Sequence, residues 1–371
     1  MKNGWQRKQI GELCEVIAGQ SPEGRFYNVD GKGKPFYQGK KDFGQKFIKD
    51  PTTWTTQVTK IAQEGDILMS VRAPVGPVNF ATGEICIGRG LAAIRTRTGL
   101  NRNFLFYQLE YLQPEISGRE GAVFASINKS EIEALPIVSA PLPEQERVVG
   151  ILDRAFEGIA TATVNAEKNL QNANALLASE RQAVFARRGP TWAVKTIDQI
   201  STNLDSKRIP ITKSERKSGK YPYYGASGIV DYVDNFIFDC DALLVSEDGA
   251  NLLMRSTPIA FSVSGKYWVN NHAHILKFDN MATQQYVEFY LESTKLDDFV
   301  RGAAQPKLTQ AALNSIPIPM PGSINAQREV VTRLSAFSEE TQRLESIYQK
   351  KLAALEALKK SLLHKAFTGQ L

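Results

Sequence analysis

The stretch that decides the fold is written twice in the chain. Residues 141–156 read PLPEQERVVGILDRAF, and residues 325–337 read NAQREVVTRLSAF, so that Gln145 aligns with Gln327. The correspondence continues along each copy to LLASERQAVF and LKKSLLHKAF. Similarity at a separation of half the chain predicts two copies of one structural unit. We therefore expect the 371 residues to form a tandem duplication.

Each copy of this stretch has the apolar spacing of a long helix, with steps that alternate between three and four residues. About 40 residues at a rise of about 1.5 Å each would span about 60 Å. Two surface helices, each on its own domain, are one alternative. We favour an antiparallel coiled coil, because like stripes separated by a whole domain meet only if the chain folds back. The expected contact residues are Val149, Leu152, Phe156, Ile159, Leu170, Leu177, Leu334, Phe337, Leu344, Ile347, Leu355, Leu358 and Leu362.

The segments before the helices have the composition of β-rich domains. Short runs such as GDILMSV, LAAIRT, DALLVS and AHILKF are cut by Gly, Pro and Asn, while NFLFYQLEYL and QYVEFYLEST each predict one short helix. Trp5 aligns with Trp192 and Pro35 with Pro222. The predicted class is α+β with a pseudo-twofold arrangement. Its boundaries are 1–142 and 189–321 for the β-rich domains and 143–188 and 322–371 for the helices, with a break at RRGP, residues 187–190.

Composition places the chain among folded proteins of a reducing compartment. Hydrophobic residues make up 42% and charged residues 23%, and no apolar run approaches the roughly 20 residues of a membrane-spanning helix. The N-terminus has no signal-peptide apolar core, which predicts the cytoplasm. Cys14, Cys86 and Cys240 form no metal-binding spacing and are expected to be small core residues.

Catalytic motifs are missing from the sequence. No Gly-Lys pair continues to Ser or Thr as a nucleotide-binding loop requires, and the Pro-Pro-aromatic motif of amino-methyltransferases is absent. Asp205 with Glu215 and Lys217 matches a minimal nuclease pattern, but a pattern this short is usually explained by chance. His272 and His274 could ligate a metal from one strand face, yet no third ligand stands near them. We therefore predict neither a catalytic nor a metal site.

Polar and basic loops remain, and they suit nucleic acid. Net charge is +6, and basic residues gather around Phe36 and Tyr37 in the first domain and before Tyr223 and Tyr224 in the second. Lys and Arg neutralise phosphates, and Arg, Asn and Gln pair with base edges. A solvated basic loop without a ligand is the alternative. The predicted DNA-binding residues are Lys32, Lys34, Gln38, Lys40, Lys41, Lys46, Arg72, Lys207, Arg208, Lys213, Arg216, Lys217, Lys220, Tyr223, Tyr224, Asn251, Asn270, Asn271 and Lys307.

The whole chain resembles the specificity subunits of type I restriction-modification systems. The resemblance rests on PLPEQERVVGIL and NAQREVVTRL, on the closing LLHKAFTGQL, and on YPYYGASGIVDYV, LLVSEDGANLL, FSVSGKYWVNNHAHIL and GAAQPKLT in the second domain. It implies two target-recognition domains held by an antiparallel coiled coil, which together read a split double-stranded DNA target. The basic loops differ most between the copies, and the helices differ least, which favours two unlike half-sites with the helices as spacer.

The resemblance also implies partners and explains the missing catalytic motifs. Two modification (methyltransferase) subunits with S-adenosylmethionine would bind the helices, and restriction subunits with ATP, Mg and nuclease activity would join them. The chain itself would then need no cofactor and would direct adenine methylation and cleavage without performing either. Two other classes stay open: a stand-alone metal-dependent nuclease and a coiled-coil scaffold that binds no DNA.

Overall fold

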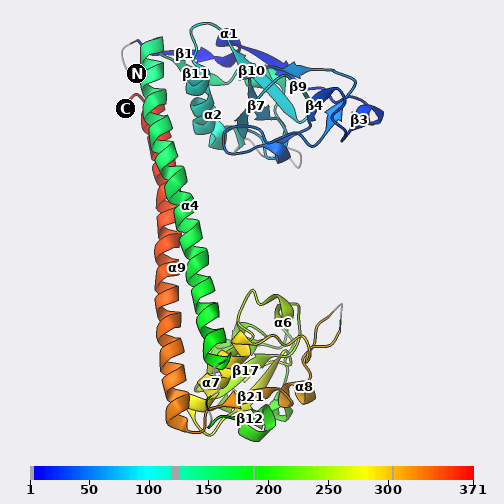
Figure 1. Ribbon diagram of the computed structural model, residues 1–371, viewed down its shortest axis with the longest axis vertical. Helices are drawn as coiled ribbons and strands as arrows, with labels where there is room; N and C mark the ends of the chain where they lie inside the picture. The colour runs from blue at the N-terminus through cyan, green and yellow to red at the C-terminus, as the bar shows by residue number, and fades with distance from the viewer. Residues whose placement is uncertain (1–3, 118–125, 187–188, 190, 303–304) are drawn as a thin grey trace. The chain divides into compact units, whose positions relative to one another are not determined.

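The structure, a computed structural model, describes residues 4–117, 126–186, 189, 191–302 and 305–371. Its contacts divide the chain into unit 1, Met1–Ala166 with Lys350–Leu371, and unit 2, Glu167–Gln349. Each unit joins one β-rich domain to parts of the same two long helices (Figure 1). Arg187, Arg188 and Pro190, where the sequence predicts a break, lie outside the described residues.

Unit 1 contains three small sheets and short helices. The sheet orders are β1-β11, β2-β10-β7-β8 and β3-β5-β4-β9-β6. The elements are β1 (Gln6–Gln9), α1 (Ile10–Leu13), β2 (Cys14–Ala18), η1 (Gly24–Phe26), β3 (Tyr27–Asn28), β4 (Lys34–Tyr37), η2 (Lys40–Asp42), β5 (Trp54–Thr55), β6 (Ile61–Ala62), β7 (Ile67–Ser70), β8 (Val78–Phe80), β9 (Ile85–Ile87), β10 (Leu91–Thr96), α2 (Arg102–Ser117), α3 (Lys129–Glu133) and β11 (Pro136–Ser139).

Unit 2 repeats the two-stranded sheet and one four-stranded sheet, but its third sheet has four strands where that of unit 1 has five. The sheet orders are β12-β21, β13-β20-β17-β18 and β15-β14-β19-β16. The elements are β12 (Ala193–Thr196), α5 (Ile197–Ile200), β13 (Thr202–Asn203), η3 (Asp205–Lys207), β14 (Ser218–Gly225), β15 (Gly228–Val233), β16 (Phe238–Asp239), β17 (Ala242–Ser246), α6 (Asn251–Met254), β18 (Ala260–Val263), β19 (Lys266–Val269), β20 (Ala273–Lys277), α7 (Met281–Ser293), α8 (Gln310–Asn314) and β21 (Pro317–Met320).

The sheets confirm the duplication at the level of strand pairing. In unit 1 the parallel pair β4·β9 starts with Phe36 opposite Cys86. In unit 2 the parallel pair β14·β19 starts with Tyr223 opposite Trp268. Parallel pairs are the exception in both units, and they occur at the aromatic positions that the sequence aligns. The predicted α+β duplication is therefore confirmed.

The two long helices are α4 (Leu142–Ala186) and α9 (Ile324–Phe367). In unit 1, Arg147 donates to the carbonyl oxygen of Leu371 at 2.7 Å, and the Lys359 ammonium lies 5.3 Å from the ring centroid of Phe156. From Arg147 to Phe156 the residue numbers rise along α4, whereas the numbers of their contact partners fall from Leu371 to Lys359. The helices are therefore antiparallel, as predicted, and Figure 1 shows them side by side. In unit 2, Arg333 of α9 pairs with Glu180 of α4.

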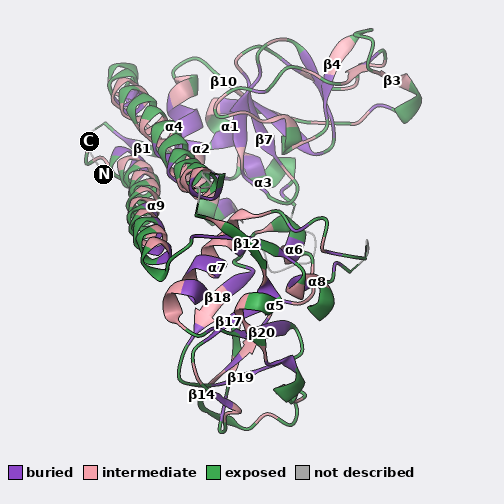
Figure 2. Ribbon diagram, turned by 60° about the horizontal axis from the view of Figure 1, so that its bottom comes forward, coloured by how far each residue is buried: buried purple, intermediate pink, exposed green. Residues whose placement is uncertain are grey.

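The helix ends belong to the cores of the β-rich domains (Figure 2). In unit 1, Leu152 of α4 and Phe367 of α9 pack in one apolar cluster with Phe104 of α2. In unit 2, Phe185 of α4 and Leu334 of α9 pack with Tyr286 of α7. The helix ends are therefore part of the core of each domain and do not lie over its surface. Among the described residues, no helix is both long and apolar enough to cross a membrane.

Candidate nucleic-acid interface

The predicted basic cluster of unit 1 lies on the loops around β4. Lys40 and Lys41 are exposed on η2, with no ion-pair partner among the described residues. Lys32 lies 3.9 Å from Asp30, and Lys34 lies 2.7 Å from Glu84. These pairs are surface pairs that an incoming phosphate can replace at little cost. The side chain of Gln38 is exposed as well and contacts Ser21.

Two other predicted residues of unit 1 differ in their surroundings. Lys46 donates to Asp153 of α4 at 2.9 Å and to the hydroxyl of Tyr107 at 3.1 Å, so its charge is already used inside the unit. Arg72 is exposed on the loop after β7, where its backbone pairs with Ser126. Lys46 is therefore a structural contact, whereas the guanidinium of Arg72 remains accessible.

In unit 2 the basic residues lie on the loop before β14 and at the start of β14, next to β15. Lys213, Lys217 and Lys220 are exposed. Arg216 is held more firmly, with its guanidinium 4.4 Å from the ring centroid of Tyr223 and 3.3 Å from Asp231. The β14–β15 hairpin also exposes three large apolar side chains of β15: Ile229, Val230 and Tyr232. Cations beside apolar groups suit a duplex, which offers phosphates and thymine methyl groups.

Several predicted DNA contacts of unit 2 are corrected by their burial. Tyr223 is 1% exposed, so its ring cannot stack on a base. Asn270 is 8% exposed, and its oxygen accepts the backbone N–H of His272 at 2.8 Å. Asn251 ties its own loop together through Thr257. Tyr224 is half-buried among aromatic rings, whereas Lys207 and Asn271 are exposed and stay predictions as DNA contacts.

A buried charged cluster connects three loops of unit 2. His274, 1% exposed, places Nδ1 2.5 Å from Asp205 Oδ2 and Nε2 2.7 Å from the carbonyl oxygen of Leu308. Arg208 reaches Glu247 Oε2 at 2.6 Å and the carbonyl oxygen of Ala273 at 2.8 Å. This use of Arg208 corrects its prediction as a DNA contact. Both imidazole nitrogens face oxygen atoms of the unit, one of Asp205 and one of Leu308.

Lys307 connects this cluster to the surface. Its ammonium lies 3.1 Å from Glu247 Oε1, and its side chain is 51% exposed. Burial alone would raise the pKa of Glu247, but the hydrogen bonds from Arg208 and Lys307 hold that pKa below its ordinary value. Burial would likewise raise the pKa of Asp205, and the contact with His274 lowers it below its ordinary value. Both carboxylates are therefore charged at neutral pH.

The residues of the nuclease and metal alternatives have structural roles instead. Asp205 is enclosed by the cluster, while Glu215 is exposed and caps Thr212. His274 has no free ring nitrogen, and His272 faces Asp248. In the part of the chain that the structure describes, no group of three or more His, Cys, Asp or Glu could hold a metal ion. The three cysteines are free, and Cys14 and Cys86 are buried.

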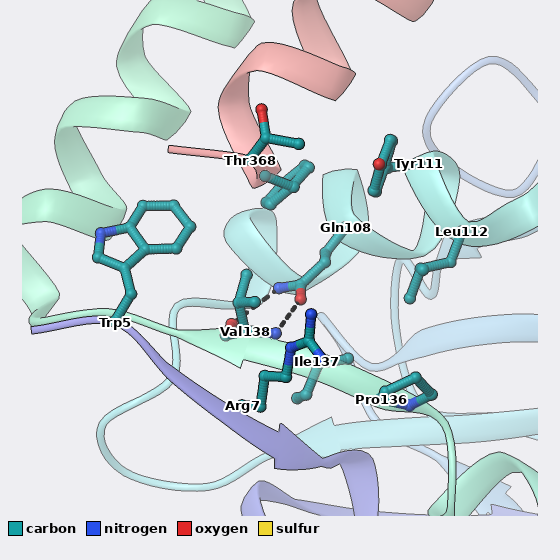
Figure 3. Close-up of a pocket in the computed structure, with 10 residues that line it drawn as sticks. Trp5, Arg7, Gln108, Tyr111, Leu112, Pro136, Ile137, Val138 and Thr368 are labelled. Carbon is teal, nitrogen blue, oxygen red and sulfur yellow. Dashed lines mark hydrogen bonds between the residues drawn. The ribbon is translucent and has the colours of Figure 1, made fainter. Parts of the chain in front are cut away.

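A pocket of about 460 Å³ in unit 1 lies where β1 and β11 meet α2 and the end of α9 (Figure 3). Gln108 spans its floor and donates to the carbonyl oxygen of Val138 at 3.0 Å. Trp5 and Phe367 supply apolar walls, and Arg7 is the charged residue that lines it. None of the predicted DNA-binding residues belongs to this pocket, so it is separate from the candidate interface of unit 1.

The helix residues predicted for the coiled coil fall into two groups. On α4 the stripe faces inward, because Val149 and Leu152 are buried and the residues that continue it are half-buried: Phe156, Ile159, Leu170 and Leu177. On α9, Leu334 is buried, and four members are half-buried: Phe337, Leu344, Leu355 and Leu362. Ile347 and Leu358 are 43% and 47% exposed, so they do not belong to the buried and half-buried stripe of α9. They stay predictions as contacts with a partner.

Comparison with known proteins decides the family. The family model described as type I restriction modification DNA specificity domain matches residues 2–171 and again residues 190–355. The chain belongs to this family. The two matches correspond to the two copies of the fold, so each unit carries one specificity domain and the start of one long helix.

Similar proteins agree with this assignment. A 148-residue segment is 41% identical to a putative type I restriction enzyme MjaX specificity subunit of Methanocaldococcus jannaschii, covering 39% of this chain and 35% of the relative. A 144-residue segment is 35% identical to a putative type I restriction enzyme specificity subunit of Haemophilus influenzae, covering 39% of this chain and 37% of the relative. The matches thus span about a third of each relative's length.

Solved structures share the fold over the whole chain. One comes from work on complex assembly and conformational transition of the type I R-M system, with a TM-score of 0.81 at 16% identity; it covers 100% of this chain and 99% of that chain. Another, an HsdS subunit from Thermoanaerobacter tengcongensis, has a TM-score of 0.60 at 16% identity, with coverage of 100% and 98%. At such identities the likeness concerns the fold.

Proposed function

We propose that this chain is the non-catalytic DNA specificity subunit of a type I restriction-modification complex and recognises a split target. One observation carries the proposal: the two units share the order of one four-stranded sheet and the packing of the long-helix ends into their cores, but differ in the loops that present basic side chains. The loop around β4 offers Lys40 and Lys41, while the β14–β15 hairpin offers Lys217 and Lys220 beside apolar side chains. Unlike loops on a shared framework read unlike half-sites.

The complex would supply the chemistry that the sequence lacks. Two modification subunits would carry S-adenosylmethionine and methylate adenine, and restriction subunits would bring ATP, Mg and nuclease activity. This chain would need no cofactor and would act in the cytoplasm. A solved structure with the same fold comes from work on complex assembly of a type I system, which supports a role within an assembly. The exposed Ile347 and Leu358 of α9 are the surface that we propose for a modification subunit.

Mapping methylated adenines in cells with and without this gene tests the proposal. We expect one split motif to be methylated only when the gene is present together with a type I modification subunit. Unchanged methylation would overturn the proposal. DNA cleavage by the purified chain alone would instead support the nuclease alternative. A stable complex with the modification subunit that binds no duplex would support the scaffold.

A further inference from the structure

The loop after β7 in unit 1 and the loop after β17 in unit 2 make the same backbone bridge. In unit 1, Arg72 pairs antiparallel with Ser126. In unit 2, Asp248 pairs antiparallel with Lys307. Each bridge stands between the end of a central strand, β7 or β17, and the residues that enter a short helix, α3 or α8.

Flanking hydrogen bonds show that the bridges are equivalent. Next to the bridge of unit 1, the N–H of Ile127 donates to Val71 at 3.1 Å, and the N–H of Val71 donates to Gly90 at 3.0 Å. The matching bonds of unit 2 join Leu308 to Glu247 at 2.8 Å and Glu247 to His272 at 2.9 Å. Val71 therefore corresponds to Glu247, and Gly90 to His272.

An exposed cation stands at this bridge in both units, but it comes from opposite sides. In unit 1 the loop residue is the cation, Arg72, and its neighbour across the bridge is the neutral Ser126. In unit 2 the loop residue is the anion, Asp248, and the cation is its neighbour, Lys307. The fold itself therefore does not dictate which position is charged. A cationic side chain stands at the bridge in both units although it occupies opposite positions of the bridge, and this recurrence indicates a function for it.

Unit 2 surrounds its cation with charged groups that unit 1 lacks. Strand register places His274 where unit 1 has Ala92, since Val245 pairs with His274 as Met69 pairs with Ala92. Ala92 in turn lies opposite Ala18 of β2. In unit 2 the strand that corresponds to β2 is β13, which ends just before Asp205. Unit 1 folds with alanines at these positions. Burying ions is costly, and besides joining η3 to β20 the cluster holds Glu247, which in turn pairs with Lys307.

A second group of unit 2 is aimed outward beside Lys307. His272 is 48% exposed, and its Nδ1 faces the carboxylate of Asp248 at 2.9 Å, the one charged group described in contact with the ring. Nε2, on the far side of the ring, has no partner among the described residues. Arg301 is exposed as well. Its backbone N–H donates to the carbonyl oxygen of Lys307 at 2.9 Å, and the N–H of Lys307 donates to the carbonyl oxygen of Arg301 at 2.7 Å.

We propose that this bridge is the phosphate-contact point of each specificity domain, formed by Arg72 in unit 1 and by Lys307 with His272 in unit 2. The inference rests on the proposed function, since the anion is the DNA backbone. His274 and Glu247 are positioning residues, because they act on the phosphate only through Lys307.

The salt dependence of binding to a pool of random-sequence duplexes tests the contact. The protein is the full chain assembled with a modification subunit. Each lost phosphate contact lowers the magnitude of the slope of log K against log salt by about 0.9. We expect this loss for Arg72→Met and for Lys307→Met. Lys277→Met is the matched control, because Lys277 is exposed at the opposite end of β20, about 10 Å along the strand from His274.

Binding to the same pool also tests His272. We expect His272→Ala to weaken this binding, because it removes the ring whose Nε2 faces outward. His274→Asn tests the positioning role, since it lowers the slope although Lys307 is present. A merely structural role would lower the unfolding temperature and leave the slope of the folded protein unchanged. If that variant does not fold, Glu247→Gln tests the same point.

The outcomes separate this inference from the proposed function. Wild-type slopes for both Arg72→Met and Lys307→Met overturn the phosphate contact while duplex binding itself persists. A wild-type assembly that binds no duplex overturns the proposed function. An equal loss in Lys277→Met overturns the assignment to the bridge, because any lysine of the unit would then suffice.

Discussion

His274 and Asp205 form a buried pair in unit 2, with 2.5 Å between Nδ1 of the imidazole and Oδ2 of the carboxylate. The carboxylate is also bonded by the backbone N–H of Ile275 at 2.8 Å. Nothing in the local sequence joins these residues, because 69 positions separate them. The pair locks η3, which precedes the basic loop, onto the central strand β20 of its sheet.

Asp205→Asn is expected to destabilise unit 2 by about 3 kcal/mol or more, because removing one partner leaves a buried charge unpaired. The pKa of Asp205 is lower in the folded chain than in the unfolded chain. Its stabilisation is therefore complete above the unfolded carboxyl pKa of about 4 and is lost as the pH falls through the folded pKa. Urea unfolding between about pH 2 and about pH 7 measures this, and the acid loss should be smaller in the variant.

Asp198→Asn is the matched control for that experiment, because Asp198 is exposed on α5 of the same unit. We expect its stability to stay within about 0.5 kcal/mol of wild type. An Asp205→Asn protein with wild-type stability at neutral pH would contradict the paired and charged state of Asp205.

Charge reversal at the β14–β15 hairpin is expected to weaken DNA binding. Lys217→Glu with Lys220→Glu places two anions where two exposed cations stand, so both affinity and the salt slope should fall. Fluorescence anisotropy with a labelled duplex over a range of salt concentrations measures both. Unchanged salt dependence would remove this hairpin from the interface.

Lys46 is expected to matter for stability and not for DNA. Its ammonium bonds to Asp153 and Tyr107 inside unit 1, and burial together with the hydrogen bond to Asp153 raises the pKa of Tyr107. Lys46→Met should therefore cost about 1.5–3 kcal/mol of unfolding free energy, the range for a hydrogen bond to a charged group. The salt slope of duplex binding should stay that of the wild type. Lys41→Met, at an exposed residue nearby, should lower the salt slope and leave the unfolding free energy unchanged. A lowered slope in Lys46→Met would show that Lys46 is a DNA contact after all.

The two groups of apolar helix residues should respond differently to truncation. Leu152→Ala removes a fully buried side chain and should cost about 2–5 kcal/mol. Ile347→Ala and Leu358→Ala remove exposed side chains and should cost less than about 0.5 kcal/mol. Co-purification with a modification subunit should nevertheless weaken in these two variants. Full retention of that partner would remove Ile347 and Leu358 from the docking surface.

Sequence alone predicted the duplication, the α4 stripe and the placement of the aromatic pairs, because these are local or periodic features. The stripe of α9 was harder to follow, since its inner positions include polar residues such as Thr341, which is 6% exposed. Apolar spacing therefore pointed to Ile347 and Leu358, which do not belong to the buried and half-buried stripe of α9. Periodicity reports hydrophobicity, and it misses an inward position that a polar residue occupies.

The candidate site was only partly predictable, because burial of a loop residue depends on distant strands. Tyr223 is buried through parallel pairing with β19, which no local pattern reveals. His272, which we propose as a phosphate contact, was not among the predicted DNA-binding residues, because the sequence analysis considered it only as a metal ligand. The orientation of His272 depends on Asp248, a contact that the sequence does not disclose.

The long helices provide a last prediction, which concerns the gap between half-sites. Inserting one heptad into both α4 and α9 keeps the inward stripe on the same face and lengthens each helix by about 10 Å. That length corresponds to about three base pairs of duplex. The methylated motif should therefore keep its half-site sequences, because the loops around β4 and β14 are untouched, while the gap between them grows. Sequencing of methylated adenines in cells that carry the lengthened chain measures both properties at once. A changed half-site with an unchanged gap would show that the helices do not set the spacing.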